Sequence, residues 1–506
     1  MNYIADAKEM KEIEKHTIDD IGISSLVLME RAALSVSEEI IKRFSKKSRI
    51  CVVCGVGNNG ADGVAIGRQL LEKEYKVDIV VLGNREKYSK EMTTQLAVIS
   101  KMKISCLDKI PNKDYDCFVD AIFGIGLARE ITDRDFGEAI DTINSSDAYI
   151  YSVDIPTGIH TDTGKVMGNA IKANETITFT CEKTGLCLYP GKEYAGKVTI
   201  KEIGISKKIV QKFPTMHFCI YKDEKIEFLD RAGDSNKGTF GKVLIIAGNS
   251  EISGAAIMCA TAAFKSGAGM VKVLAEEENL DIIKKTLPEA MVQSLSNVQD
   301  MEEIINNNLK WADSVVIGPG IGMNDNAYNK LFNTLKNFPA DKKLVIDADG
   351  INLIAKYDEL KMLTNKMNNV IYTPHMMELE RLLEKDRVFL KDNLDVVMTE
   401  AIKDNRAVYV CKDSVTRVYK NEKPIYINRY GNSGMATAGS GDVLAGIIGA
   451  LVARKNADIF DVAVLGVFLH SLAGDLAARN LGENSLMAGD IINSLPAILK
   501  DMEDVN

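Results

Sequence analysis

A chain of 506 residues is too long for one ordinary hydrophobic core, and at roughly 150 residues per domain it predicts two or three domains, of which we favour two. Hydrophobic residues at 46% and charged residues at 26% are typical of a folded protein and exclude wholesale disorder. The net charge of −9 argues against a nucleic-acid or anionic-membrane partner, because either partner would favour a basic face.

The N-terminal segment MNYIADAKEMKEIEKHTIDD predicts an amphipathic helix rather than a signal peptide, because it carries acidic residues early and has no apolar core. No window reaches the roughly 18 uninterrupted apolar residues of a membrane helix, so we expect a cytoplasmic protein. The nine scattered cysteines predict reduced, buried thiols. Cys51 and Cys54 form a CxxC pair within a predicted strand and should face opposite sides of a sheet, which argues against a metal or redox site.

Apolar β-branched runs alternate with helical stretches from end to end, which predicts α/β domains with mainly parallel sheets. The predicted strands lie at residues 49–55, 77–83, 115–124 and 148–156 in the first half, and at residues 242–248, 270–275, 314–320, 343–350, 369–375 and 407–412 in the second. The pattern lapses after Gly204, so we place the domain boundary near residue 213 and expect domains at 1–213 and 214–506. The segment up to about residue 236 fits either domain.

Polar residues follow three of the predicted strands of the first half. The stretch GVGNNGADG is a glycine-rich turn that could present backbone N–H groups to an anion, although a plain tight turn explains it equally well. It fits neither the Walker A nor the GxGxxG pattern. Ligands of parallel sheets gather at the carboxyl ends of strands, so Asn59, Asp120, Asp154 and Thr157 could converge there. Such oxygen donors suit a hard cation or a sugar hydroxyl, and helix capping is the structural alternative.

These residues carry a resemblance to the NAD(P)H-hydrate epimerase family. The motifs LVLMERAALSV, GVGNNGADG, DAIFGIGL, SVDIPTGI and TITFTCEKTGL occur in the family's order across about residues 1–205. The resemblance implies a potassium ion on Asn59, Asp120 and Thr157. From the chemistry of its carboxyl group we expect Asp154 to be the acid–base residue. The resemblance also implies substrate contacts from Asn58, Asn59, Gly60, Ala61, Asp62, Gly124, Ile125, Gly126, Leu127, Ala128, Arg129, Glu130 and Asp154. Ala61 departs from the usual glycine, so the loop must relax if this position needs a positive φ angle.

In the second half, the stretch GNSGMATAGSGDVL places four glycines before Asp442. Glycines let backbone N–H groups crowd around an anion, and a helix beginning near Asp442 would add its positive end, so the stretch predicts a phosphate site. A lone carboxylate at a helix start is usually a cap, but beside a phosphate it could take the proton of an attacking hydroxyl. His375, considered alone, is more simply a structural histidine.

This stretch resembles the ribokinase-type kinases and, more closely, the ADP- or ATP-dependent NAD(P)H-hydrate dehydratases. KGTFGKVLIIAG, GPGIG, VIDADGINL, YTPHMMELERLL and GNSGMATAGSGDVLAGIIGAL follow that family's order across about residues 235–495. The resemblance implies that the hydrate contacts Ala255, Gly320, His375 and Asp442. It implies that the nucleotide contacts Lys412, Asp413, Ser414, Val415, Thr416, Ser433, Gly434, Met435, Ala436, Thr437, Ala438, Gly439, Ser440 and Gly441.

This half also departs from the family pattern. Asp413 replaces a glycine, Met376 and Met377 replace Pro-Gly, and Asn236 replaces a histidine. Asp413 would add negative charge beside a polyphosphate, so the departures bear on nucleotide preference.

Together the two resemblances imply two three-layer α/β/α domains, the first Rossmann-like and the second ribokinase-like. They imply an enzyme that epimerises hydrated NADH and NADPH (NADHX and NADPHX) and then dehydrates the S epimer with ADP or ATP and Mg²⁺. We expect a homo-oligomer with no nucleic-acid or membrane partner. A small-molecule kinase of the ribokinase type with a fused dinucleotide-binding domain and a non-catalytic dinucleotide sensor are the alternatives.

Overall fold

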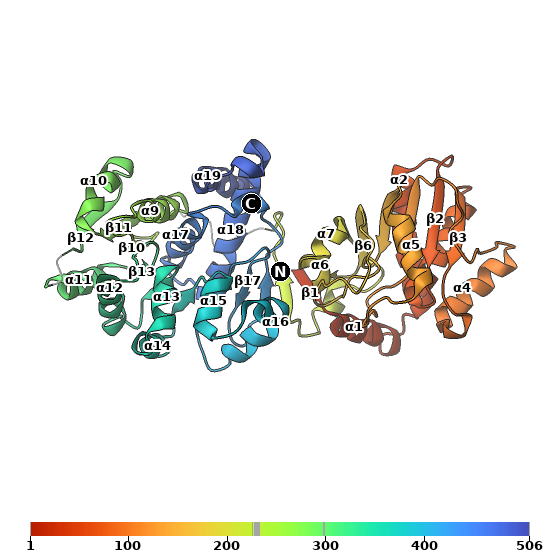
Figure 1. Cartoon of the computed structure of the whole chain (residues 1–506), viewed down its shortest axis with the longest axis horizontal. Coiled ribbons are helices and arrows are strands. Elements are labelled where there is room, and N and C mark those ends of the chain that lie inside the picture. The colour runs from red at the N-terminus through yellow and green to blue at the C-terminus, as the bar shows by residue number, and fades with distance from the viewer. Residues whose placement is uncertain (1, 225, 227–232, 297–298, 505–506) are drawn as a thin grey trace. The chain divides into compact units, whose positions relative to one another are not determined.

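The structure is a computed structural model that describes residues 2–224, 226, 233–296 and 299–504 (Figure 1). The chain forms two compact units, Met1–Phe218 and Cys219–Asn506, and the division falls inside strand β9 (His217–Cys219). Each unit has a mainly parallel sheet with helices on both faces, which confirms the expected α/β class. The segment of uncertain assignment near residue 236 lies partly outside the described residues.

The first unit contains a parallel six-stranded sheet in the order β3-β2-β4-β5-β6-β8, and β1 pairs in parallel with β7. The strands are β1 (Asn2–Ala5), β2 (Arg49–Cys54), β3 (Lys76–Val81), β4 (Cys117–Ala121), β5 (Tyr149–Val153), β6 (Glu175–Phe179), β7 (Glu182–Lys183) and β8 (Lys197–Lys201). The helices are α1 (Ala7–Asp19), α2 (Ser25–Arg43), α3 (Asn58–Glu72), η1 (Arg85–Lys87), α4 (Lys90–Lys101), α5 (Arg134–Asn144), α6 (Thr184–Cys187), α7 (Gly191–Ala195) and α8 (Lys207–Val210). The order reverses between β2 and β4, so their carboxyl ends border the crevice where ligands of such sheets bind.

Successive side chains of β2 point to opposite faces of this sheet and pack with different helices. Ile50, Val52 and Cys54 pack with residues of α1, α2, α3 and α4, whereas Cys51 and Val53 pack with residues of α5. Cys51 and Cys54 therefore face opposite sides, as predicted. All nine cysteines of the chain are free thiols, and only Cys106 among them is not buried.

The second unit contains parallel strands in the order β12-β11-β10-β13-β14-β15-β16, followed by antiparallel β17 and β18. The strands are β10 (Lys242–Ile246), β11 (Met270–Ala275), β12 (Met291–Ser294), β13 (Ser314–Ile317), β14 (Lys343–Ile346), β15 (Val370–Tyr372), β16 (Val408–Cys411), β17 (Arg417–Tyr419) and β18 (Ile425–Ile427). The helices are α9 (Gly254–Lys265), α10 (Glu277–Thr286), α11 (Met301–Trp311), α12 (Asp325–Lys336), α13 (Asp349–Lys356), α14 (Asp358–Thr364), α15 (Met376–Leu383), α16 (Arg387–Ala401), η3 (Ser433–Met435), α17 (Ser440–Val452), α18 (Ile459–Leu481), η4 (Glu483–Ser485) and α19 (Ala488–Asp504). The order reverses between β10 and β13, which places a second ligand crevice beyond their carboxyl ends.

Close helix packing positions this second crevice. A Cβ atom at Gly446 of α17 would lie 2.2 Å from the carbonyl oxygen of Cys259 in α9, so glycine lets the two backbones touch. The first turns of α9 and α17 are thereby held at the same edge of the sheet. Helix α18 is long and apolar enough to cross a membrane by length and composition, but 83% of its apolar window is buried inside the protein, as in the core helix of a folded domain.

Candidate active sites

A pocket of about 550 Å³ lies at the crevice of the first unit, bordered by the turns after β2 and β4. Many predicted substrate-binding residues line it: Asn58, Asn59, Asp62, Gly124, Ile125, Gly126, Leu127, Ala128, Arg129 and Asp154. Glu130 is exposed just beyond this lining. The pocket therefore brings together residues from three separate strand ends.

Gly60 and Ala61 are buried beneath the pocket rather than lining it. A Cβ atom at Gly60 would lie 1.9 Å from the carbonyl oxygen of Gly55, so this glycine is required by close backbone approach. Ala61 lies inside α3, is fully buried and has no positive φ angle. The condition under which alanine would force the loop to relax, a positive φ angle, is therefore not met, because a helical backbone accepts alanine without strain.

The three predicted potassium ligands adjoin one turn. The Asp120 carboxylate is fully buried and accepts hydrogen bonds from Thr157 Oγ1 at 2.6 Å and Ser152 Oγ at 2.8 Å. Thr157 Oγ1 also accepts the Phe123 N–H at 3.0 Å, and a Cβ atom at Gly124 would lie 3.2 Å from the side chain of Asn59. Burial raises the pKa of Asp120, and no cationic side chain pairs with it in the described part of the chain. The Asp120 carboxylate therefore has no counter-charge among the described residues, and the oxygen-bearing side chains of Thr157 and Asn59 adjoin the same turn.

Asp154 is held in an unusual conformation. Its φ angle of 68° lies in the left-handed region, which non-glycine residues adopt rarely. The turn directs its carboxylate to Lys183 Nζ at 2.5 Å and Thr178 Oγ1 at 3.1 Å. Lys183 is only 1% exposed, so Asp154 is half of a buried ion pair that opens into the pocket. Sequence reasoning missed Lys183.

Asp442 lies in the first turn of α17 in the second unit, where the predicted helix begins. Burial, reinforced by the nearby Asp347 carboxylate, raises the pKa of Asp442 to about 7, while Lys412 opposes this rise. A base whose pKa lies near neutral pH accepts and returns a proton readily. The position therefore suits general-base chemistry better than a simple helix cap.

Lys412 and Asp347 form an ion pair beside this helix start, with Nζ and Oδ1 2.7 Å apart. Asp347 is 1% exposed and also accepts a hydrogen bond from Thr373 Oγ1 at 2.6 Å. A Cβ atom at Gly441 would lie 3.1 Å from Lys412 Nζ, so the two predicted nucleotide segments meet here. Ala348, next to Asp347, has a φ angle of 48°, and this strained turn directs Asp347 and Asp349 to the same edge.

His375 caps α15. Its Nδ1 accepts hydrogen bonds from the N–H groups of Met377 and Glu378, both at 3.2 Å, so the proton of the neutral ring lies on Nε2. Burial lowers the pKa of His375 and raises the pKa of Glu378 to about 7. The helix begins directly at Met376, so the missing Pro-Gly pair does not disturb this cap. His375 is both a capping residue and, at 47% side-chain exposure, accessible to a ligand.

Gly320 and Ala255 meet at the crevice. Gly320 has a φ angle of 63°, and a Cβ atom there would lie 3.1 Å from Ala255 Cβ and 2.9 Å from Ile252. Cys259 lies one turn further along α9, and burial, reinforced by the charges of Asp442 and Asp347, raises the pKa of its thiol. Ala255, Gly320 and Asp442 therefore border one site.

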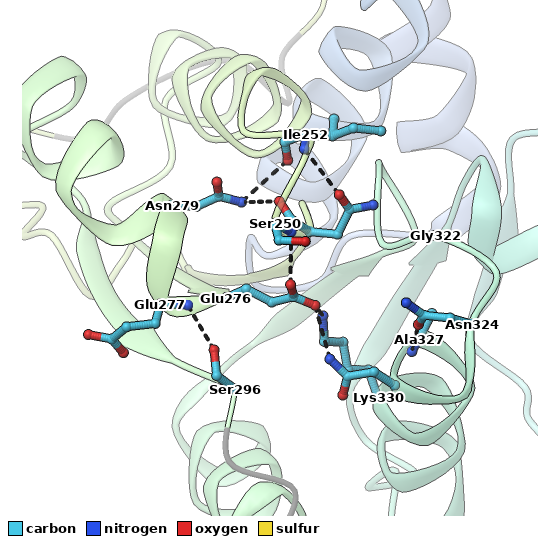
Figure 2. A network of polar contacts seen from close by, with 12 residues as sticks. Ser250, Ile252, Glu276, Glu277, Asn279, Ser296, Gly322, Asn324, Ala327 and Lys330 are labelled. Carbon is cyan, nitrogen blue, oxygen red and sulfur yellow. Dashed lines mark hydrogen bonds and ion pairs between the residues drawn. The ribbon is translucent and has the colours of Figure 1, made fainter.

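The turn before α9 is held by a polar network (Figure 2). Asn279 Nδ2 donates to the carbonyl oxygens of Asn249 at 2.7 Å and Ile252 at 3.3 Å. Glu276 accepts the N–H of Ser250 at 2.8 Å and pairs with the nearly buried Lys330 at 2.7 Å. The network fixes the turn whose Ile252 side chain presses on Gly320.

Further contacts hold the predicted nucleotide segments. The Asp413 carboxylate pairs with Lys391 Nζ at 3.7 Å, which offsets the extra negative charge noted in the sequence. Ser433 Oγ donates to Glu483 at 2.5 Å, and Ser440 Oγ contacts the buried His470 Nε2 at 3.3 Å. Among the described residues, no group of three or more His, Cys, Asp or Glu side chains has the arrangement of a metal site.

Comparisons with known proteins also divide the chain into two parts. Residues 243–497 match the family described as NAD(P)H-hydrate dehydratase, and residues 25–185 match the YjeF-related protein N-terminus. The bifunctional NAD(P)H-hydrate repair enzyme Nnr of Moorella thermoacetica is 32% identical over 99% of this chain and 97% of its own length. The protein of the same name from Coxiella burnetii is 32% identical over 99% of this chain and 100% of its own.

Among solved structures, a ribokinase-like superfamily protein from Enterococcus faecalis covers 57% of this chain and 98% of its own, with 29% identity and a TM-score of 0.51. The fold and the two crevices thus define a two-domain α/β enzyme whose second domain is ribokinase-like. The chain belongs to the family of bifunctional NAD(P)H-hydrate repair enzymes, which join an epimerase to a dehydratase. Family membership favours this function over the kinase and sensor alternatives.

Proposed function

We propose that the pocket of the first unit interconverts the R and S epimers of NADHX and NADPHX, with Asp154 as an acid–base residue. The observation that carries this assignment is the Asp154–Lys183 ion pair, which places a carboxylate of fixed orientation in the pocket. Inverting the C6 centre requires proton transfer at its hydroxyl group, and a carboxylate within hydrogen-bond reach of that group can perform it. The turn residues Asn58–Asp62 and Gly124–Glu130 would hold the dinucleotide.

We also assign a potassium ion to Asn59, Asp120 and Thr157. The buried Asp120 carboxylate has no cationic partner in the described part of the chain, and hydroxyl, amide and carboxylate oxygens are donors for a hard cation. The ion would neutralise Asp120 and fix the turn that carries Gly124.

Replacing potassium with choline is expected to lower the melting temperature of the first unit and slow use of the R epimer. Without the cation, the buried Asp120 charge is uncompensated, which destabilises the turn beside the pocket. Calorimetry measures the first effect and NADH recovery the second. Dehydration of the S epimer serves as the internal control and should not change. Identical melting curves in both salts would contradict the assignment.

In the second unit, Asp442 would take the proton of the C6 hydroxyl as the hydroxyl oxygen attacks the terminal phosphoryl group of ADP or ATP. Phosphate then leaves C6 as a proton leaves C5, which restores the ring double bond. Backbone N–H groups of Ser433–Gly441 and the Lys412 ammonium would stabilise charge on the transferred phosphoryl group. Mg²⁺ bound to the nucleotide would neutralise its phosphates. Ala255, Gly320 and His375 would contact the hydrate, and Lys412–Thr416 the nucleotide.

The test mixes the purified protein with both epimers of NADHX, ADP or ATP and Mg²⁺, and follows the near-ultraviolet absorbance of NADH. Complete recovery with release of phosphate is expected. A stable phosphorylated alcohol would instead indicate the kinase alternative. We propose a cytoplasmic location, which the nine free thiols support, and a homo-oligomer, which light scattering measures directly.

Asn279→Ala is expected to raise the KM for the S epimer, by about tenfold if roughly 1.4 kcal/mol of turn ordering is lost. The variant removes Asn279 Nδ2, while the carbonyl groups of Asn249 and Ile252 keep their mutual backbone hydrogen bonds at 3.1 Å, so Ile252 is held less firmly on Gly320 (Figure 2). Steady-state kinetics with ADP held saturating measures the change. Asn337→Ala, which removes an exposed hydrogen bond to Glu302, is the matched control. An unchanged KM would contradict the role of the turn.

A further inference from the structure

Helix α1 carries an acidic residue on its inner face. The helix buries Met10, Ile13 and Thr17, and Glu14 lies on the same stripe because it is four residues after Met10 and three before Thr17. Such a stripe normally holds apolar residues, so a carboxyl here is unusual. Glu14 thus stands out as a polar residue placed on the packed side of its helix.

The position of α1 is fixed from its N-terminal side. Strand β1 pairs with β7, with Ala5 opposite Lys183, and the helix then begins with a capping box between Asp6 and Glu9. The N–H of Ala7 donates to Asp162 Oδ1 at 2.7 Å. These contacts align α1 with the strand that carries Lys183, the partner of Asp154.

Glu14 lines the epimerase pocket together with Asp154 and Asp62. It makes no hydrogen bond or ion pair within the described part of the chain, so no structural contact explains its presence there. The charged groups that act on Glu14 are Asp154, Lys183 of β7 and Lys11 of its own helix. Glu14 in turn contributes, after burial and Asp154, to the raised pKa of Asp62, which lines the same pocket. Burial, reinforced by Asp154, raises the pKa of Glu14 to about 7, whereas Lys183 and Lys11 lower it.

Several carboxyl groups line the pocket, and Glu14 and Asp154 differ in their ion-pair partners. Asp154 is paired with a buried ammonium group, whereas Glu14 has no such partner and is half protonated near neutral pH. Enzymes divide acid and base roles between carboxyl groups that lie in different surroundings. Since the two residues come from α1 and from the turn after β5, they can approach a bound ring from different directions.

We propose that Glu14 is the second acid–base residue of epimerisation, working with Asp154. This inference rests on the epimerase function proposed for the pocket. Protonated Glu14 donates its proton to the C6 hydroxyl of the R epimer, the C6–O bond breaks, and water leaves as the ring nitrogen lone pair forms a C6=N1 double bond. A water molecule then adds to the other face of C6, gives its proton to Asp154, and the nitrogen lone pair is restored. Proton exchange with solvent resets both carboxyl groups, and the roles reverse for the S epimer.

The test follows NADH recovery from purified R epimer with saturating ADP and Mg²⁺, using S epimer as the internal control. Glu14→Gln keeps the shape of the side chain but cannot donate its proton, so R-epimer use should fall on the order of 100-fold while S-epimer use stays unchanged. Glu14→Asp should restore part of the rate. Added formate should accelerate Glu14→Ala, because a free acid can supply the missing proton. Wild-type R-epimer use should fall as the pH rises through about 7, since the donor is the protonated form.

Glu12→Gln is the matched control, because Glu12 is exposed on the same helix and pairs with the exposed Lys8. It should leave both rates unchanged. If folded Glu14→Gln retains R-epimer use within about threefold while Asp154→Asn loses it, the proposal for Glu14 fails and the epimerase pocket stands. If both variants retain the activity, the function proposed for the pocket fails instead. Glu14→Ala that is folded, inactive and insensitive to formate would also overturn the acid–base role.

Discussion

Asp442→Asn is expected to reduce recovery of NADH from the S epimer on the order of 10²- to 10⁴-fold, the usual range for losing a general base. Asparagine preserves the size of the side chain at the start of α17 but cannot accept the proton of the C6 hydroxyl. Nucleotide binding should survive, because Lys412 and the glycine segment remain in place. Stopped-flow absorbance with purified S epimer, together with calorimetric titration of ADP, separates the two quantities.

The role of Asp442 as a base also predicts how the rate of dehydration changes with pH. Burial and Asp347 raise the pKa of Asp442 to about 7, and only the ionised form is a base, so dehydration should accelerate as the pH rises through about 7. Asp461→Asn is the matched control, because Asp461 lies in the first turn of α18 and is exposed. An Asp442→Asn enzyme that keeps its rate would overturn the assignment of Asp442 as the base.

The positions of the strands follow from local sequence signals. Runs such as RICVVC and KVLII are apolar and β-branched, and they form β2 and β10 where expected. Strands of a parallel sheet are buried on both faces and are therefore apolar along their whole length, so they can be recognised from the local sequence alone. The site residues at strand ends, including Asp120 and Asp154, follow from the same rule. The same rule singles out Asp347 and Asp349, which lie one and three residues after the end of β14.

The charge partners could not be predicted this way. Lys183 reaches Asp154 because β1 pairs with β7 and because Asp154 adopts a positive φ angle, and neither feature has a local sequence signature. Glu378 similarly has the sequence position of a helix-start residue, and burial, reinforced by Asp347 and Asp349, raises its pKa to about 7. These residues depend on long-range packing, whereas the strand-end carboxylates depend on chain order alone. The sequence therefore predicts the positions of the reactive carboxyl groups, whereas their protonation states depend on burial and on charged partners that only the structure shows.

Lys412→Met is expected to lower the free energy of unfolding of the second unit by about 3 kcal/mol and to weaken nucleotide binding. The substitution removes the ammonium group 2.7 Å from Asp347, which is 1% exposed and would keep its hydrogen bond from Thr373. A buried carboxylate without a counter-charge destabilises the folded state, so the substitution should lower the free energy of unfolding as well as the affinity for the nucleotide. Urea titration followed by the fluorescence of Trp311, the only tryptophan of the chain, reports this unit specifically.

Two further variants distinguish the loss of the buried Lys412–Asp347 ion pair from the loss of any positive charge. Lys420→Met removes an exposed pair with Asp458, and its effect should stay within about 1 kcal/mol. Adding Asp347→Asn to Lys412→Met should restore part of the stability, because neither partner then remains as an unpaired buried charge, while nucleotide binding stays weak. If Lys412→Met unfolds at the wild-type urea concentration, the ion pair does not organise the start of α17, and Lys412 acts on the nucleotide alone.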